Sequence, residues 1–430
     1  MAFKKTGISI PNPFEIAIVL TLIVLGAATL STEHSFIDNV GFWGDGLWSL
    51  LSFMTQMCLI LLGGYVLAAS KPVNKLLLLL VKIPKTNNQI YLMTLFVSTL
   101  TCWLNWGLGL VASAFFALEM ARANKKTNFP LLVAISYMGF IFWHGGLSGS
   151  IPLVVGTPNN FSYQWLGELI GFEQTVFSFF NLSLIGALFV SLSILVLYFA
   201  KKTEGVILQG PNNFETSGIE KSAAESEEKT MLSKALHWLL LTMFVTYLGA
   251  LVVSGRFSVG LNLINFILIG LGLFLHGSLN RYMEAIKSGC GKLGPILVQY
   301  PLYAGIMGVI IQSGLVVRIS NAFVYMSSET TYPLFMFLSA GLVNFFVPSG
   351  GGQWAVQAPV VIEGAKQLGV PMWKVVMAVA WGDAWTNLAQ PFWALPLLSI
   401  VGLGIKDIMV YCLAALLVSG VVIGGFFLFF

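Results

Sequence analysis

The sequence predicts an all-α membrane protein that crosses the bilayer many times and consists of two similar halves. Three observations predict this fold class. Hydrophobic residues make up 57% of the 430 residues and charged residues only 9%, whereas a soluble domain carries about 25% charged residues. Many apolar stretches also reach the roughly 20 residues that a spanning helix needs. Finally, each half contains one apolar stretch that is interrupted by polar residues, glycine and proline.

Nine apolar stretches are predicted to be full spans. They lie near residues 14–30, 47–69, 129–158, 176–200, 235–254, 258–276, 294–315, 371–400 and 408–428. Region 89–122 is different, because it contains two apolar arms of about 15 residues, which reach only about 22 Å and cannot cross a core of roughly 30 Å. Region 333–368 repeats this pattern. We therefore predict two re-entrant hairpins in addition to the nine spans.

The polar stretch 201–234 predicts a flexible cytoplasmic linker between two membrane repeats. The first repeat covers 1–200, and a connecting span within 235–257 leads to the second repeat, 258–430. Because the connecting span adds one crossing, the repeats are expected to have inverted topology. The alternative is that apolar segments resemble each other by chance. In both repeats a hairpin precedes a broken helix: 89–122 and 129–158 in the first, 333–368 and 371–400 in the second.

The charge distribution predicts the orientation of the chain. Most Lys and Arg residues fall in loops on one predicted side, whereas the opposite loops hold mainly acidic residues. The positive-inside rule then places the N-terminus in the cytoplasm, and nine spans place the C-terminus on the outer, periplasmic side. The chain has no basic soluble domain, so nucleic acid is not expected as a partner.

The two broken helices predict where a ligand binds. His144 begins the first break and Asp383 the second, and each lies eight positions before a proline. Irregular backbone inside a membrane survives only where it lines a cavity or binds something. Two such breaks in corresponding positions are typical of the binding site of a secondary transporter.

Asp383 and His144 are the candidate residues for ion coupling. Asp383 lies about 12 residues past Pro371, and therefore roughly 18 Å into the membrane core, where a carboxylate is costly. It could coordinate a cation, carry a proton or pair with His144; the alternative is a structural cap. Histidine changes charge near neutral pH, so a proton relay between the two residues is possible. The alternative for His144 is an ordinary hydrogen bond inside the bundle.

The second hairpin tip predicts an anion site. Glycines allow close backbone approach, and the half-helix that starts near Gln353 presents free N–H groups and a positive dipole end, which suit a carboxylate. The alternative is an ordinary loop turn. The predicted substrate-binding residues are Asn105, Gly107, His144, Ser148, Ser349, Gly350, Gly351, Gly352, Gln353 and Asn387, and Thr386 and Ser150 are expected to assist Asp383 in ion coupling. Tryptophans near these motifs could cover an apolar substrate tail or simply pack.

Catalysis has little support in the sequence. No Walker A, HExxH or GxSxG motif is present, and neither the four cysteines nor the four histidines show metal-site spacing. We therefore expect no enzyme activity, no bound metal or cofactor, and at most Na⁺ as a coupling ion.

Three stretches resemble the bacterial short-chain fatty acid transporter family: His144–Ser150, Asn344–Pro359 and Trp381–Asn387. The resemblance implies uptake of acetoacetate or butyrate across the inner membrane. It also implies membership of the larger ion-transporter superfamily, with a homodimer that moves by an elevator motion. Dicarboxylate carriers of that superfamily have Ser-Asn-Thr hairpin tips, which this chain lacks.

The sequence and the resemblance together predict a secondary active transporter for small monocarboxylates, coupled to H⁺ or Na⁺. The membrane potential opposes anion entry by about 2.3 kcal/mol per charge per 100 mV, so coupling is expected. The alternatives are a passive anion channel, a carrier for dicarboxylates or amino acids, and an intramembrane enzyme.

Overall fold

The fold is all helical, as predicted. The computed structural model describes residues 13–49, 51–124, 127–156, 160, 162–203, 231–257, 261–291, 293–348 and 350–430. Every regular element in these residues is a helix. Most of the predicted linker 201–234 lies outside the described residues, as does the predicted substrate-binding residue Ser349.

The first half contains eleven described helical segments. They are α1 (Pro13–Ser31), α2 (Phe36–Gly46), α3 (Leu51–Ala68), α4 (Lys71–Val81), α5 (Asn87–Leu104), α6 (Trp106–Ala123), α7 (Phe129–Met138), the 3₁₀ helix η2 (Gly139–Phe142), α8 (Ser150–Gly156), α9 (Tyr163–Leu166) and α10 (Phe179–Lys202). Side-chain caps explain several of the boundaries. Thr86 and Gln89 form a capping box at the start of α5, and the Asn128 side chain accepts the Leu131 N–H at the start of α7.

The second half repeats the order of the first. Helix α12 (Met231–Val253) connects the halves. The repeat then comprises α13 (Leu261–His276), α14 (Leu279–Cys290), α15 (Gly294–Gln312), α16 (Leu315–Tyr325), α17 (Tyr332–Asn344), α18 (Gly350–Leu368), α19 (Met372–Thr386), the 3₁₀ helix η3 (Asn387–Ala389), α20 (Pro391–Val401) and α21 (Ile405–Phe429). Each half thus begins with four helices that alternate between long and short. Two helical arms and an interrupted helix follow, and a long helix ends the half.

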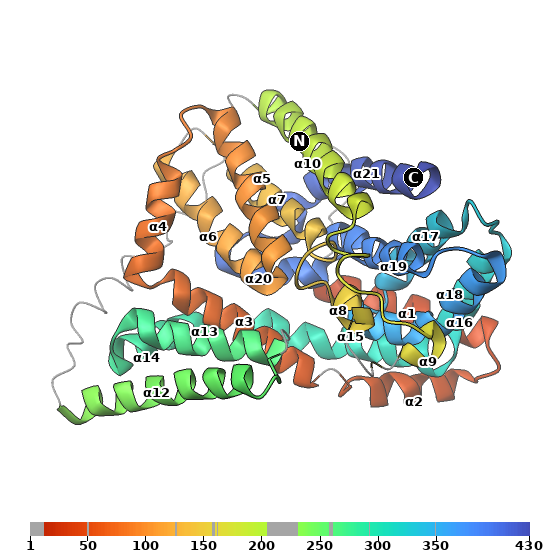
Figure 1. Ribbon diagram of the computed structural model, residues 1–430, viewed down its shortest axis with the longest axis horizontal. Helices are drawn as coiled ribbons and strands as arrows, with labels where there is room; N and C mark the ends of the chain where they lie inside the picture. Colours follow the sequence, from red (N-terminus) through yellow and green to blue (C-terminus); the bar gives the residue numbers. More distant parts are fainter. Residues whose placement is uncertain are drawn as a thin grey trace.

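The first four helices of each half exchange partners with those of the other half. Helix α3 packs against α13 and α14, whereas α15 packs against α1 and α2. Glycines permit the second of these contacts, because a Cβ on Gly46 of α2 would lie 2.8 Å from the Ala304 carbonyl oxygen of α15. In Figure 1, α3, α13 and α14 lie together at the lower left, and α1, α2 and α15 lie together at the lower right. The exchange supports two structurally related halves.

The hairpins and broken helices exchange partners in the same way. Helix α6, the second arm of the first hairpin, packs against α20 of the second broken helix. Helix α18, the second arm of the other hairpin, packs against α8 of the first broken helix. The long helices α10 and α21 pack against each other, and each also contacts this group. The polar interruptions of the two halves are therefore gathered into one buried region.

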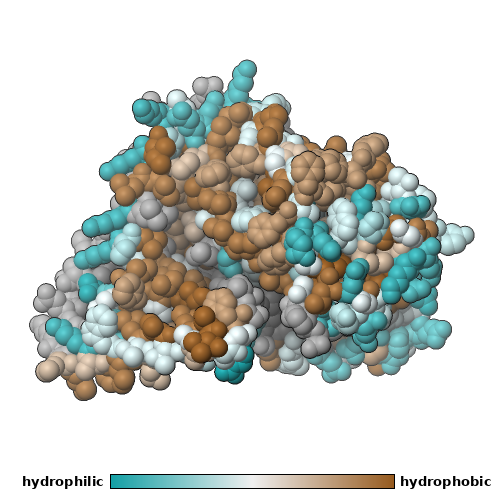
Figure 2. All heavy atoms as spheres, viewed as in Figure 1, coloured by the Kyte–Doolittle hydropathy of each residue, from teal (hydrophilic) through white to brown (hydrophobic). Residues whose placement is uncertain are grey.

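Three helices of the described residues are long and apolar enough to cross a membrane: α10, α12 and α21. They correspond to the predicted spans 176–200, 235–254 and 408–428. Among the described residues, four of the other predicted spans, 14–30, 129–158, 258–276 and 294–315, contain shorter apolar helices, so the count of nine remains a prediction. Hydrophobic residues cover much of the face shown in Figure 2, with hydrophilic residues toward its edges. Helix α12, for example, exposes Trp238, Leu239 and Val245.

Candidate functional site

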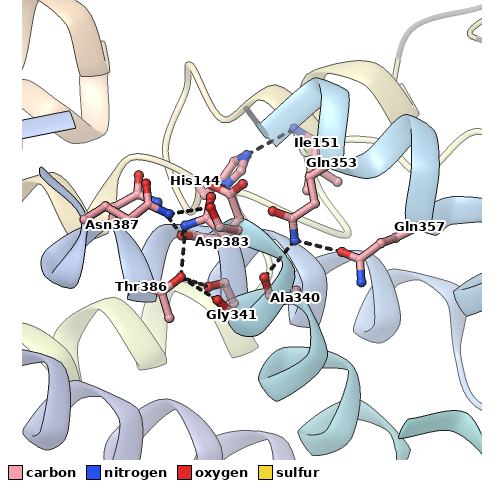
Figure 3. Close-up of polar contacts among 12 residues, drawn as sticks. His144, Ile151, Ala340, Gly341, Gln353, Gln357, Asp383, Thr386 and Asn387 are labelled. Atoms are coloured by element: carbon pink, nitrogen blue, oxygen red, sulfur yellow. Dashed lines mark hydrogen bonds and ion pairs between the residues drawn. The ribbon is translucent and has the colours of Figure 1, made fainter. Parts of the chain in front are cut away.

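The fold brings the two predicted ionisable residues together. His144 lies in the loop between η2 and α8, and Asp383 lies in the last turn of α19. The imidazole Nδ1 is 3.3 Å from the Asp383 Oδ1, and the side chains are 0% and 1% exposed (Figure 3). The two atoms face each other at ion-pair distance but without hydrogen-bond alignment. The pair directly joins the broken helices of the two halves.

A backbone contact fixes the orientation of the His144 ring. The Ile151 N–H, at the start of α8, donates to the imidazole Nε2 at 3.4 Å (Figure 3). An imidazole nitrogen that accepts a hydrogen bond carries no proton, so in this arrangement the ring proton belongs on the other nitrogen, Nδ1. Nδ1 faces the Asp383 carboxylate. The ring therefore presents one nitrogen to a backbone donor and the other to a carboxylate.

The second hairpin tip approaches the same imidazole. A Cβ atom on Gly350 would lie 2.5 Å from Cε1 and 2.6 Å from Nε2 of His144, so only glycine permits this approach. Gly350 is the first residue of α18, so the positive dipole end of this helix lies beside the ring. Gly350 is buried, whereas Gly351 and Gly352 are partly exposed.

Gln353 is buried one turn into α18. Its amide nitrogen donates to the Ala340 carbonyl at 2.9 Å and to the Gln357 Oε1 at 2.8 Å. Because a carbonyl oxygen only accepts, this contact fixes the amide orientation and directs Oε1 away from Ala340. That oxygen has no hydrogen-bond partner among the described residues. Gln353 can therefore accept a hydrogen bond from a ligand.

Asn387 and Thr386 belong to a hydrogen-bond network around the end of α19. The amide nitrogens of Asn387 and Asn344 both donate to the Asp383 carbonyl oxygen. The Thr386 hydroxyl accepts from Asn344 at 2.9 Å and donates to the Gly341 carbonyl at 2.9 Å. The Gln390 amide nitrogen donates to the Asn344 carbonyl. The amide oxygens of Asn344, Asn387 and Gln390 have no partner in the described part of the chain.

The first hairpin tip is attached to the first break. The Ser148 hydroxyl accepts the Trp106 N–H at 2.9 Å, and the Leu147 N–H donates to the Trp103 carbonyl at 2.8 Å. The predicted residues Asn105 and Gly107 lie at this tip, and Gly107 is buried. Ser148, predicted to bind substrate, thus has a structural contact at the start of α6. Ser150 begins α8 and is partly exposed, next to the Ile151 N–H.

Asn181 of α10 is a site residue that sequence reasoning missed. Its amide nitrogen donates to the carbonyls of Gly145 at 2.9 Å and Val176 at 2.8 Å, and its oxygen accepts from the Trp381 Nε1 at 3.0 Å. Asn181 is completely buried. A buried asparagine in an otherwise apolar helix is costly without a purpose, and this signal could have identified it. The contacts hold the loop of His144 against α19.

Aromatic rings pack beside His144. Trp143 stacks on the imidazole with ring centroids 3.7 Å apart. Trp143, Trp106 and Trp393 have pairwise centroid distances of 5.1 to 6.2 Å. Phe140 of η2 stacks on Trp143 at 5.8 Å. The cluster places an apolar, water-poor wall next to the polar pair. Among the described residues, no three His, Cys, Asp or Glu side chains gather into a metal site.

The sequence is similar to those of known proteins over almost its whole length. Residues 3–430 match the short chain fatty acid transporter family. A relative from Escherichia coli (strain K12) is 39% identical over 417 residues, which cover 96% of this chain and 94% of the relative. A relative from Haemophilus influenzae is 37% identical over 451 residues, which cover 99% and 98%. The names of both assign them provisionally to short-chain fatty acid transport.

Two solved structures are also similar over most of their length. The YdaH transporter of Alcanivorax borkumensis has a TM-score of 0.47 and 15% identity, covering 96% of this chain and 98% of that one. MtrF of Neisseria gonorrhoeae has a TM-score of 0.40 and 16% identity, covering 99% and 96%. The family match and the two relatives confirm the resemblance predicted from the glycine-rich motifs. The chain is a multi-pass membrane protein that belongs to the short chain fatty acid transporter family.

Proposed function

We propose that the chain is a secondary active transporter that takes up short-chain fatty acid anions, such as butyrate or acetoacetate, across the inner membrane of a bacterium. Family membership supports the substrate class. The observation that carries the proposal is the buried contact of His144 with Asp383, flanked by the N-termini of α8 and α18. A site of this kind can hold a carboxylate and an ion together.

The carboxylate binds between the two helix N-termini. Helix N-termini bind anions through free N–H groups and the dipole. Gly350 and Gly351 let the start of α18 approach the ligand. The buried side-chain oxygens of Gln353 and Asn387, which lack partners among the described residues, only accept hydrogen bonds. They therefore suit a coupling cation or a donor group of the ligand, and not the carboxylate itself. Ser349 precedes Gly350 in the sequence and is proposed to bind the same carboxylate. Asn105 and Gly107 of the first hairpin and Ser148 of the first break are proposed to line the site from the other half.

The aromatic cluster covers the alkyl tail. Trp106, Trp143 and Trp393 are at most 4% exposed and pack next to the imidazole. Burial of each CH₂ group contributes about 0.8 kcal/mol, so a tail of three carbons gains on the order of 2 kcal/mol from such a wall. This gain favours monocarboxylates over dicarboxylates, because a second carboxylate would have to be buried against apolar rings.

Uptake is coupled to H⁺ or Na⁺, and Asp383 is the residue on whose charge the coupling depends. The free amide oxygens of Asn344, Asn387 and Gln390 are hard acceptors that would suit Na⁺, with Thr386 and Ser150 nearby in the two breaks. The chain works as a homodimer in the lipid bilayer, with a cytoplasmic N-terminus and a periplasmic C-terminus. It has no enzyme activity.

Uptake into proteoliposomes tests this proposal. Purified protein would be given labelled acetoacetate or butyrate under an inward Na⁺ gradient, an inward H⁺ gradient, or neither. Undissociated acid crosses bilayers unaided, so protein-free liposomes at the same pH gradient are the necessary baseline. Saturable accumulation above this baseline supports a coupled carrier. Uptake that only equilibrates supports a passive channel, and the absence of uptake by folded protein would refute the substrate class.

A further inference from the structure

We infer that His144 carries the coupling proton on Nε2, and that this proton and the substrate carboxylate bind together or not at all. This inference rests on the proposed function and names the coupling ion and its atom. It follows from three contacts: the Ile151 N–H with Nε2 at 3.4 Å, Nδ1 with Asp383 at 3.3 Å, and Gly350 against the ring edge.

Without ligand, each ring nitrogen of His144 faces a group of the protein. The lone pair of Nε2 accepts the Ile151 N–H, which at the start of α8 would otherwise lack an acceptor. On the other side of the ring, Nδ1–H faces the Asp383 carboxylate. His144 is completely buried, so water does not replace either contact. With Asp383 ionised, the resting site carries one negative charge.

Neither the proton nor the anion fits alone. A proton on Nε2 would point N–H at the Ile151 N–H, so two buried donors would face each other without an acceptor. A carboxylate alone would compete with Nε2 for the Ile151 N–H, and it would add a second negative charge beside Asp383 in a medium of low dielectric. Each partial state loses a contact that the resting state has.

Both together fit. The carboxylate accepts from the Ile151 N–H and from the new Nε2–H, while Nδ1–H still faces Asp383. The proton comes from the solution on the side of entry and leaves on the other side with the anion. The charges of the proton and the carboxylate cancel, so the site keeps the single negative charge of Asp383. Transport is therefore electroneutral, and the membrane potential neither drives nor opposes it.

Gly350 brings the start of α18 against the edge of the imidazole at which this exchange occurs. Any side chain at this position would contact Cε1 and Nε2 of His144. The start of α18 therefore meets the imidazole at the atom that gains the proton. The free N–H groups at this end of α18 are further hydrogen-bond donors for the carboxylate.

Asp383 is the charged group that faces His144 among the described residues. The neighbouring elements carry other charged side chains only toward their far ends: Lys374 on α19, Glu363 and Lys366 on α18, Glu119 and Arg122 on α6, and Lys201 and Lys202 on α10. Two other buried titratable groups lie in the surrounding elements: the Tyr137 hydroxyl donates to the Asn387 carbonyl, and Cys102 packs against Gly109 in the first hairpin. The pH dependence of binding therefore reports on the His144 and Asp383 pair, whose members the His144→Gln variant separates.

Calorimetric titration of the purified full-length protein with potassium butyrate tests the inference. Binding is measured at several pH values above 7 and in buffers of different ionisation enthalpy. We expect uptake of about one proton per butyrate, and a Kd that rises about tenfold per pH unit. His144→Gln keeps an oxygen that can accept the Ile151 N–H but takes no proton, so its proton uptake should be zero. His34→Gln, between α1 and α2, is the matched control and should behave as the wild type.

The outcomes separate the inference from the proposed function. Butyrate binding without proton uptake, with or without added Na⁺, overturns the inference and leaves the transporter proposal intact. Proton uptake that persists in His144→Gln also overturns it. No butyrate binding by folded wild type in either salt refutes the proposed function. If His144→Gln binds too weakly to titrate, wild-type uptake is measured under an imposed K⁺ diffusion potential, and a dependence on this potential overturns the inference.

Discussion

Gly350→Ala should disable transport while leaving the fold intact. A Cβ at this position would lie 2.5 Å from Cε1 and 2.6 Å from Nε2 of His144, and 3.1 Å from the Trp143 ring. Carbon atoms prefer separations of about 3.5–4.0 Å, so the imidazole or the start of α18 must move by about 1 Å. The imidazole cannot move freely, because it is stacked on Trp143 and held between Ile151 and Asp383.

The size of the effect follows from this displacement. The Ile151 contact is already 3.4 Å long, so a movement of about 1 Å breaks it. Misplacement of a functional group by about 1 Å costs on the order of 100-fold in rate. We expect the ratio Vmax/KM for uptake to fall about 10- to 100-fold. Overpacking costs about 1–3 kcal/mol of stability, which a melting curve should detect without loss of folding.

Two further alanine variants make this experiment decisive. Gly186→Ala in α10 is the matched control, because its Cβ would meet nothing within 4 Å and it lies outside the site. Gly351→Ala also meets nothing within 4 Å, so any loss of uptake there reports on the ligand and not on packing. Wild-type uptake by Gly350→Ala in proteoliposomes would refute the contact between the hairpin tip and His144.

Three other substitutions test separate parts of the site. Asp383→Asn should abolish accumulation against a gradient, measured as the steady-state ratio of inside to outside substrate. The control Asp407→Asn, at the exposed start of α21, should accumulate substrate as the wild type does. Full accumulation by Asp383→Asn would contradict its coupling role. Asn181→Ala leaves the Trp381 N–H without its acceptor and should cost about 1–3 kcal/mol, seen as a lower melting temperature together with slower uptake. Ser148→Ala removes the acceptor of the Trp106 N–H and should lower the free energy of unfolding by about 1 kcal/mol. The melting temperature should fall while the substrate KM stays nearly unchanged. A large change in KM at an unchanged melting temperature would favour direct substrate contact.

Sequence reasoning singled out two residues that the structure brings into contact, but not the reason they meet. His144 and Asp383 stood out because each precedes a proline in an interrupted apolar stretch, and the structure places them 3.3 Å apart. The contact depends on the exchange of partners between the halves, which no local pattern encodes. Likewise, the glycines of the second tip were expected near a ligand, but their packing on His144 depends on tertiary approach.

Some parts of the fold were harder to read from the sequence. Helices α2 and α14 follow α1 and α13, and their mixed polar and apolar composition hid them among loops and spans. Ser148 was predicted to bind substrate because its hydroxyl falls in the break, and its contact with the Trp106 N–H at the tip of the first hairpin was not foreseen. The role of Asn181 depends on two partners that are 36 and 200 residues away. Such contacts are visible only in three dimensions.

The exchange of partners between the halves has a consequence for synthesis. Helix α3 packs against α13 and α14, and the Val66 carbonyl meets the His276 ring across 210 residues of sequence. At 5–20 residues per second, the ribosome needs about 10–40 s to produce that distance of chain. During this time α3 can pack against α6 of its own half but lacks α13 and α14. The first half must therefore wait in the membrane in an unfinished arrangement, and a chain interrupted before α13 would leave both α1 and α3 without their partners from the second half.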